Sequence, residues 1–293
     1  MKKNAGYTLI RLLTLPMQLF PLEFHYGASA FLFFLMYHVF RYRRVVVEKN
    51  LAASFPEKSG KERKRIGRDF YRSFAAMFIE TLYFIHINVE KEAQRLNVQN
   101  AELIDCLLHE GKNVVLMGGH FGNWEFFQLF TRKLDANRFY VYKKIRNEAF
   151  DRLYRDLRAR GATPLEMNET YRRLLSEYRR KQKFIAFFIS DQRPIPEDLR
   201  HWIPFMKQDT PIMTGTEKIA RKTDAAVVYT EIRRIKRGVC LLRFDLITEN
   251  STLLPPLEIT RIFFQKLEES IRSAPEQYLW THKRWKYQRK PNA

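Results

Sequence analysis

Apolar and polar residues alternate along this chain with two different periods. Short continuous apolar runs bounded by polar or glycine residues are typical of buried strands, and three such runs lie at 113–117, 139–142 and 184–189. Between and around these runs, apolar residues recur three and four positions apart, which predicts helices at 100–111, 147–160 and 168–183. Strands that alternate with helices indicate an α/β fold, here a mixed central sheet flanked by helices.

Two further patterns lie on either side of this region. Residues 61–87 place apolar side chains, several of them aromatic, on one face, which predicts an amphipathic helix. Its aromatic stripe is expected to pack in the core, with an acyl-chain groove as the alternative. Residues 225–232 and 239–247 predict two strands joined as a hairpin around the Arg-Gly pair at 237–238.

The N-terminal part of the chain is unusually apolar. Residues 7–40 carry only two formal charges, and the best uninterrupted stretch, 24–40, is 17 residues long. That length is at the lower limit of a membrane span, while aromatic residues next to a basic cluster favour an interfacial anchor. The sequence therefore predicts a membrane-associating helical segment, spanning or monotopic, over 1–45 and an α/β domain over 46–293. The alternative is an apolar helix buried in a globular domain.

Charge adds a constraint on partners. The chain carries 52 Lys and Arg against 32 Asp and Glu, a net charge of +20, so its surface potential attracts anionic partners. Residues 41–68 hold ten basic residues against three acidic ones. Nucleic acid, anionic lipid headgroups and acidic carrier proteins all fit such a surface. No nucleic-acid-binding motif is present, and the apolar N-terminal part argues against that class, so no nucleic acid is expected.

Single residues outside the main motif carry weaker signals. The chain has two cysteines, Cys106 and Cys240, whose spacing indicates neither a disulfide framework nor a zinc site. No metal is expected. Cys106 lies among leucines and is expected in the core. Asn100 and Asn168 precede two of the predicted helices and are their expected N-caps.

The most informative stretch is Gly-Gly-His-Phe-Gly-Asn-Trp-Glu at 118–125, which follows the first buried strand directly. His120 would lie in a strand-to-helix turn, with Glu125 in the first turn after it. A histidine acts as a general base when one ring nitrogen is free and a carboxylate holds the other. Glu125 is the expected orienting carboxylate. The structural alternative is a capping histidine followed by an acid that suits the helix dipole.

Other candidates follow from strand ends. In α/β sheets, ligands bind beyond the carboxyl ends of the strands, and both His120 and Asp191 follow predicted strands. Arg146 and Arg158 flank the next strand–helix unit, where arginine suits recognition of a phosphate or an acyl carbonyl. The alternatives are ordinary surface arginines and a turn aspartate. The expected substrate-binding residues are Gly122, Asn123, Arg146, Arg158, Asp191 and Gln192.

The stretch His-Phe-Gly-Asn-Trp-Glu resembles the His-x4-Asp/Glu motif of the lysophospholipid acyltransferase superfamily, in the glutamate form of the bacterial lipid A biosynthesis acyltransferases. Similar segments follow the same order elsewhere in the chain, at 43–56, 191–192 and 275–286. The chain departs from the family pattern at Met206 and Lys207, where many relatives carry Phe-Gly. This departure bears on the acceptor and on chain-length preference, and leaves the reaction class unaffected.

The resemblance implies a membrane-associated O-acyltransferase. The implied acyl donor is acyl-acyl carrier protein, with acyl-CoA as the alternative, and the implied acceptor is a hydroxyl of a lipid A precursor at the cytoplasmic face of the inner membrane. His120 would remove the hydroxyl proton while Glu125 fixes its ring, without a further cofactor. The expected partners are acyl carrier protein, an anionic lipid substrate and the membrane surface. Acylation of another lipid, a lysophospholipid or an aminolipid, is the alternative acceptor chemistry, and a basic nucleic-acid-binding protein is the alternative class.

Overall fold

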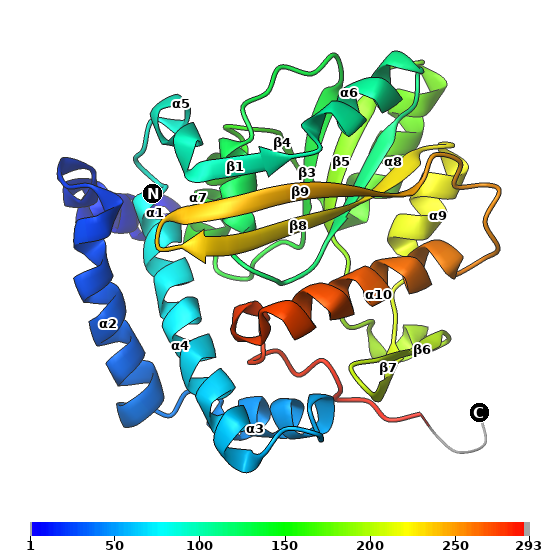
Figure 1. The fold of residues 1–293 in the computed structure, drawn as a ribbon. Coiled ribbons are helices and arrows are strands. Elements are labelled where there is room, and N and C mark those ends of the chain that lie inside the picture. Colours follow the sequence, from blue (N-terminus) through cyan, green and yellow to red (C-terminus); the bar gives the residue numbers. More distant parts are fainter. Residues whose placement is uncertain (1, 290–293) are drawn as a thin grey trace.

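A central sheet organises the computed structural model, which describes residues 2–289. Its seven strands lie in the order β1-β9-β8-β2-β5-β3-β4 (Figure 1). All neighbours are parallel except β8 and β9, which form an antiparallel hairpin. The bounds are β1 Leu96–Gln99, β2 Val114–Gly118, β3 Asn137–Tyr142, β4 Thr163–Glu166, β5 Phe184–Ile189, β8 Ala226–Lys236 and β9 Val239–Thr248.

Helices cover both faces of this sheet. On one face α8, α9 and α10 pack against Val115 and Met117 of β2, and on the other α6 and α7 pack near Val114 and Leu116. Burial on both sides explains why β2 reads as a continuous apolar run. These helices are α6 Ala101–His109, α7 Glu148–Arg158, α8 Met167–Arg179, α9 Gly215–Lys222 and α10 Glu258–Ser273.

The remaining elements are mostly short. A two-stranded antiparallel hairpin, β6 Trp202–Phe205 and β7 Gln208–Pro211, lies below α10 in Figure 1. The other α-helices are α1 Lys2–Thr14, α2 Tyr26–Phe34, α3 Arg44–Ser54, α4 Gly60–Tyr83 and α5 Val89–Glu92. The 3-10 and π segments are η1 Leu15–Leu19, η2 Leu22–His25, η3 Leu35–Val39, η4 Ala93–Arg95, η5 Trp124–Leu129, η6 Pro196–Asp198 and η7 Pro275–Gln277.

The N-terminal segment is helical and folds back onto the rest of the protein. Helix α2 runs beside α4 (Figure 1), and Leu22 and Tyr26 are buried in the core of the sheet domain. Its outer face carries exposed apolar side chains, including Leu13, Phe31 and Phe40. Among the residues that the structure describes, no single helix has the length and apolar character of a membrane span, whereas Ala5–Leu19 and Leu22–Val39 have them together but are bent by 119°.

The α/β fold predicted from the sequence is confirmed. Each predicted apolar strand is present, and so is the hairpin around Gly238, but β1, β4 and the β6–β7 hairpin were not predicted. Asn100 takes the predicted N-cap position of α6, although its side chain makes no capping hydrogen bond, whereas the prediction for Asn168 is wrong. Asn100 has a positive φ of 58° and its amide donates to the Phe244 carbonyl, while Asn168 lies inside α8, which begins at Met167. Cys106 is exposed rather than in the core, and Cys240 is buried.

Candidate active site

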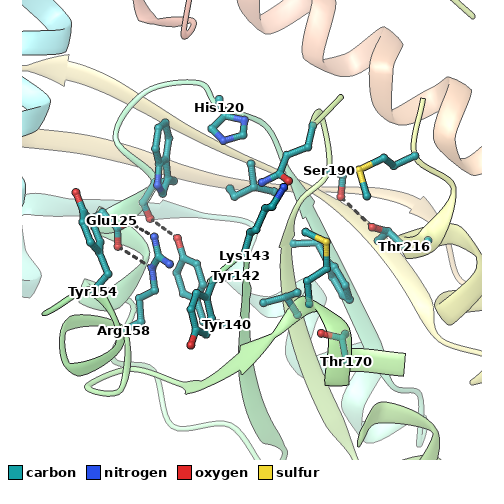
Figure 2. Close-up of a pocket in the computed structure, with 18 of the residues that line it drawn as sticks. His120, Glu125, Tyr140, Tyr142, Lys143, Tyr154, Arg158, Thr170, Ser190 and Thr216 are labelled. Atoms are coloured by element: carbon teal, nitrogen blue, oxygen red, sulfur yellow. Dashed lines mark hydrogen bonds and ion pairs between the residues drawn. The ribbon is translucent and has the colours of Figure 1, made fainter. Parts of the chain in front are cut away.

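A cavity of about 510 Å³ opens at the carboxyl ends of β2, β3 and β5. Figure 2 shows the ring of His120 at its upper end, with Glu125 and Arg158 grouped on one side and Ser190 and Thr216 on the other. Its volume falls in the range of about 300–1,000 Å³ usual for small-molecule sites. Apolar side chains form much of the wall: Met77, Phe78, Val141, Ile145, Met167, Phe188, Ile189, Met213 and Ile219.

His120 is held by Asp191. Strands β2 and β5 pair in parallel, with Gly118 opposite Ile189. His120 lies two positions after Gly118, and Asp191 lies two positions after Ile189. The Nδ1 atom of His120 lies 2.6 Å from Oδ1 of Asp191, which also accepts from the His120 backbone N–H at 3.1 Å. Nδ1 therefore carries the ring proton, and Nε2 is the nitrogen left to accept one.

The surroundings keep Asp191 charged. The side chain is fully buried, which by itself raises the pKa of a carboxyl group. The charges of His120 and Arg284 act in the opposite direction and prevail, so the pKa of Asp191 lies below its ordinary value. An ionised carboxylate at this position stabilises the imidazolium that forms when His120 takes up a proton.

Glu125 does not orient the ring of His120, which corrects the expectation from the sequence. Its carboxylate is buried and bound in a bidentate pair by Arg158, with distances of 3.2 Å from Nε and 2.5 Å from Nη2. The guanidinium also lies over the rings of Tyr140 and Tyr154, at 4.7 and 5.2 Å from their centroids. Burial lowers the pKa of Arg158, but Glu125 and Tyr140 outweigh it and raise the pKa above its ordinary value. Arg158 therefore stays charged in the cavity wall.

The turn between His120 and Glu125 is fixed by close backbone packing. Gly122 has a φ of +65°, and a Cβ atom there would lie 1.8 Å from the carbonyl oxygen of Ile232. Only glycine fits such a position without distortion. The side chain of Asn123 accepts from the backbone N–H of Glu125 at 3.2 Å and begins the 3-10 helix η5. Gly122 therefore shapes the turn, and Asn123 both lines the cavity and caps η5.

The C-terminal segment closes the other side of this turn. Gly122 N–H donates to the Gln277 carbonyl at 2.9 Å, and Leu279 N–H donates to the His120 carbonyl at 3.0 Å. Phe121 and Tyr278 form an isolated antiparallel bridge between these bonds. The turn of residues 120–125 is thus paired with a segment about 155 residues further along the chain, as expected of non-local sheet-like pairing.

Three residues of this segment surround the His120–Asp191 pair. The ring of His282 lies 6.1 Å from that of His120, centroid to centroid, and burial lowers the pKa of His282 to about 4. Arg284 is fully buried and donates from Nη2 to the Pro211 carbonyl at 2.7 Å. The Tyr278 hydroxyl and Asp191 Oδ2 are buried without a direct partner among the described residues. Buried polar atoms of this kind require water or ligand contacts.

The remaining predicted residues divide into two groups. Gln192 lines the cavity, whereas Arg146 is exposed and lies outside the residues that line it. Trp124 also lines the cavity, and its ring lies 5.0 Å from that of His120, centroid to centroid, at an angle of 86°. Cavity residues that sequence reasoning missed are Tyr140, Lys143, Tyr154, Ser190, Thr216 and Lys218. Tyr140 alternates with apolar residues along β3, and Tyr154 lies on α7. From sequence alone, both positions indicate core packing.

The departure at Met206 and Lys207 maps to a tight turn. Both residues have positive φ angles, 50° and 60°, and they join β6 to β7. Met206 is buried, its N–H donates to Glu268, and the Lys207 ammonium pairs with Glu57 at 2.8 Å. Neither residue lines the cavity. Within the described chain, no group of three or more His, Cys, Asp or Glu side chains is arranged to hold a metal ion.

A histidine held by a buried carboxylate at the end of a largely apolar cavity is compatible with transfer of an acyl chain to a hydroxyl, as in an α/β acyltransferase. The chain belongs to the bacterial lipid A biosynthesis acyltransferase family, whose pattern it matches over residues 4–287. The family resemblance and the acyltransferase activity predicted from the sequence are both confirmed.

The chain is also similar to two individual proteins. The chain is 25% identical over 252 residues to the lipid A biosynthesis lauroyltransferase of Escherichia coli, covering 83% of this chain and 79% of that protein. Among solved structures, it is similar to the 1-acyl-sn-glycerophosphate acyltransferase PlsC of Thermotoga maritima, with a TM-score of 0.38 and 12% identity, over 87% of this chain and 97% of the other.

Proposed function

We propose that this acyltransferase moves a fatty acyl group from the thioester of acyl-acyl carrier protein to a hydroxyl of a lipid A precursor. The observation that carries the proposal is the contact of 2.6 Å between His120 Nδ1 and Asp191 at the end of an apolar cavity. The family membership supports lipid A chemistry, and the lauroyltransferase relative supports a fatty acyl donor.

The proposed chemistry needs only groups that the chain supplies and the two substrates. Nε2 of His120 takes the proton of the acceptor hydroxyl as its oxygen attacks the thioester carbonyl. The tetrahedral intermediate then loses the thiolate of the carrier, which recovers the proton from the imidazolium. Asp191 holds the tautomer and stabilises the imidazolium between these two steps. The products are an ester on the acceptor and the free thiol of the carrier.

Glu125 remains a proposed site residue with a different task from the one expected. Its bidentate bond with Arg158 fixes a fully charged guanidinium against the cavity wall. A rigid arginine so placed suits contact with an oxygen-rich part of a substrate, such as a phosphate or a carbonyl. We propose that Glu125 acts through Arg158, while Asp191 acts on His120.

The donor and membrane assignments rest on the surface. Lys143 and Lys218 line the cavity and are exposed, and the chain as a whole carries a net charge of +20. Such a surface suits an acidic carrier protein. The exposed apolar side chains of α1 and α2, together with the basic residues of α3, suit an anionic lipid surface. We propose attachment to the inner membrane, with the catalytic domain facing the cytoplasm.

A donor-and-acceptor panel tests these assignments. Purified protein is supplied with acyl-acyl carrier protein or acyl-CoA, and with lipid A precursors, lysophospholipids or aminolipids, and products are identified by mass spectrometry. The expected result is transfer from the carrier to the lipid A precursor, lost in His120→Ala and weakened by added salt. Transfer only to a lysophospholipid or an aminolipid would reject the proposed acceptor, and equal rates from acyl-CoA at all salt concentrations would reject the proposed donor.

A further inference from the structure

We propose that Glu80 of α4 is a positioning residue for the catalytic turn, residues 120–125, and that it acts through Asn123. The inference rests on the proposed function, because it assigns Glu80 a part in that same reaction. Glu80 is fully buried in the last turn of a helix whose neighbouring positions pack in the core. A carboxylate in such a place is unfavourable unless several donors compensate it.

Three donors from distant parts of the chain meet at this carboxylate. The hydroxyl of Tyr26 donates to Oε1 at 2.7 Å, the amide of Asn123 donates to Oε2 at 2.9 Å, and Nη2 of Arg234 donates to Oε2 at 2.9 Å. Tyr26 lies on α2, Asn123 lies between His120 and Glu125, and Arg234 lies on β8. Glu80 thus joins the N-terminal segment, the catalytic turn and the sheet.

The carboxylate also determines which way the amide of Asn123 points. An ionised carboxylate can only accept hydrogen bonds, so it binds the NH₂ group of Asn123 and not its oxygen. The Oδ1 atom is then directed to the backbone N–H of Glu125, from which it accepts at 3.2 Å. A reversed amide would place NH₂ against that N–H and leave two donors facing each other. Glu80 therefore selects the amide orientation that begins η5 and places the Glu125–Arg158 pair.

A second route leads from the same carboxylate to the turn. The backbone N–H and carbonyl of Arg234, which binds Glu80, both bond with the side-chain amide of Gln277, at 2.7 and 3.0 Å. The Gln277 carbonyl in turn accepts from Gly122 N–H at 2.9 Å. The turn is held at Gly122 and at Asn123 by paths that converge on Glu80. Positioning of this kind affects the rate, because small displacements of catalytic groups are costly.

The test compares two buried glutamates. Glu80→Gln keeps the size of the side chain but introduces an NH₂ group that must face one of the three donors. Glu231→Gln is the matched control, since Glu231 is also buried and bound by an arginine, Arg243 at 2.9 Å, but is not bonded to the catalytic turn. For both variants, kcat, the KM for acyl-acyl carrier protein, Tm and hydrogen–deuterium exchange are measured on the full chain.

For Glu80→Gln we expect kcat to fall by about tenfold or more with KM for the donor within about twofold, and faster exchange confined to the segments around 119–126 and 275–279. Glu231→Gln should lower Tm comparably and keep kcat. A Glu80→Gln protein with wild-type kcat and exchange, or one whose loss of kcat matches that of the control at equal Tm, overturns the proposal.

Two arms keep the test decisive. If Glu80→Gln does not fold, Tyr26→Phe removes only the donor to Oε1, and we expect it to lower kcat by about threefold and to speed exchange at 119–126; an unchanged protein in both respects overturns the proposal. If the wild-type protein transfers no acyl group from any donor, the proposed function fails, and the exchange comparison alone decides the role of Glu80.

Discussion

The carboxylate of Asp191 and the ring of His120 meet at 2.6 Å across the carboxyl ends of two adjacent parallel strands. Each residue lies two positions past its strand, so the pairing of β2 with β5 sets their distance. Because the rigid centre of the sheet holds both side chains, the imidazole is kept in one orientation before any substrate binds. Preorganisation of this kind is a large part of general-base catalysis.

Substituting Asp191 by Asn should therefore remove most of the activity while leaving the fold intact. The amide would still occupy the space, but it can hold the ring in the wrong tautomer and cannot stabilise the imidazolium. We expect kcat for acyl transfer to fall by about 10²- to 10⁴-fold. Asp135→Asn, an exposed aspartate paired with Lys183, is the control and should retain full activity. Wild-type kcat in Asp191→Asn would contradict the assigned role.

The Glu125–Arg158 pair makes a different prediction. Removing one member leaves the other charge buried, so Glu125→Gln and Arg158→Met should each lower the free energy of unfolding by about 3–5 kcal/mol. The double variant should lose much less than the sum, because no uncompensated charge remains. Urea unfolding of all four proteins measures this coupling. Strictly additive losses would show that the two side chains act independently.

His282 should make stability depend on pH. In the unfolded chain its pKa is near 6.5, whereas burial lowers the pKa in the folded protein to about 4. The unfolded state therefore binds more protons between these values, so stability rises with pH across the interval and falls as the solution is acidified. Between pH 7 and pH 5, wild type should lose about 1–2 kcal/mol more free energy of unfolding than His282→Gln. Parallel pH profiles would reject this.

The apolar wall should limit the length of the transferred chain. Met213 lines the cavity and is only half-buried, so a larger side chain can be introduced there with little strain on the core. In Met213→Trp we expect the ratio of kcat/KM for shorter acyl donors to kcat/KM for longer ones to rise by about tenfold for every few methylenes of space lost from the site. Competition assays with donors of graded length measure the shift. Met36→Trp, at a partly buried position on η3 outside this cavity, is the control.

The strands that form the floor of the site could be predicted from sequence because each is a continuous apolar run, as in 184–189. The missed strands β1 and β4 are four residues long and half-exposed, so their apolar pattern is too short to read. Asp191 was recognised as a strand-end residue, but its bond to His120 depends on β2 and β5 being neighbours. Sequence spacing instead favoured Glu125, whose partner Arg158 lies on a helix 33 residues away.

The pairing of the catalytic turn with residues 277–279 has a consequence for how the enzyme is made. Synthesis proceeds from the N-terminus, and domains fold as they emerge from the ribosome. The N-terminal helices are therefore made early, while the partner of Gly122 and His120 is made about 155 residues after the turn itself. Nascent chains that still lack this segment hold an unpaired turn, so the site around His120 is completed only after residues 277–279 have been synthesised.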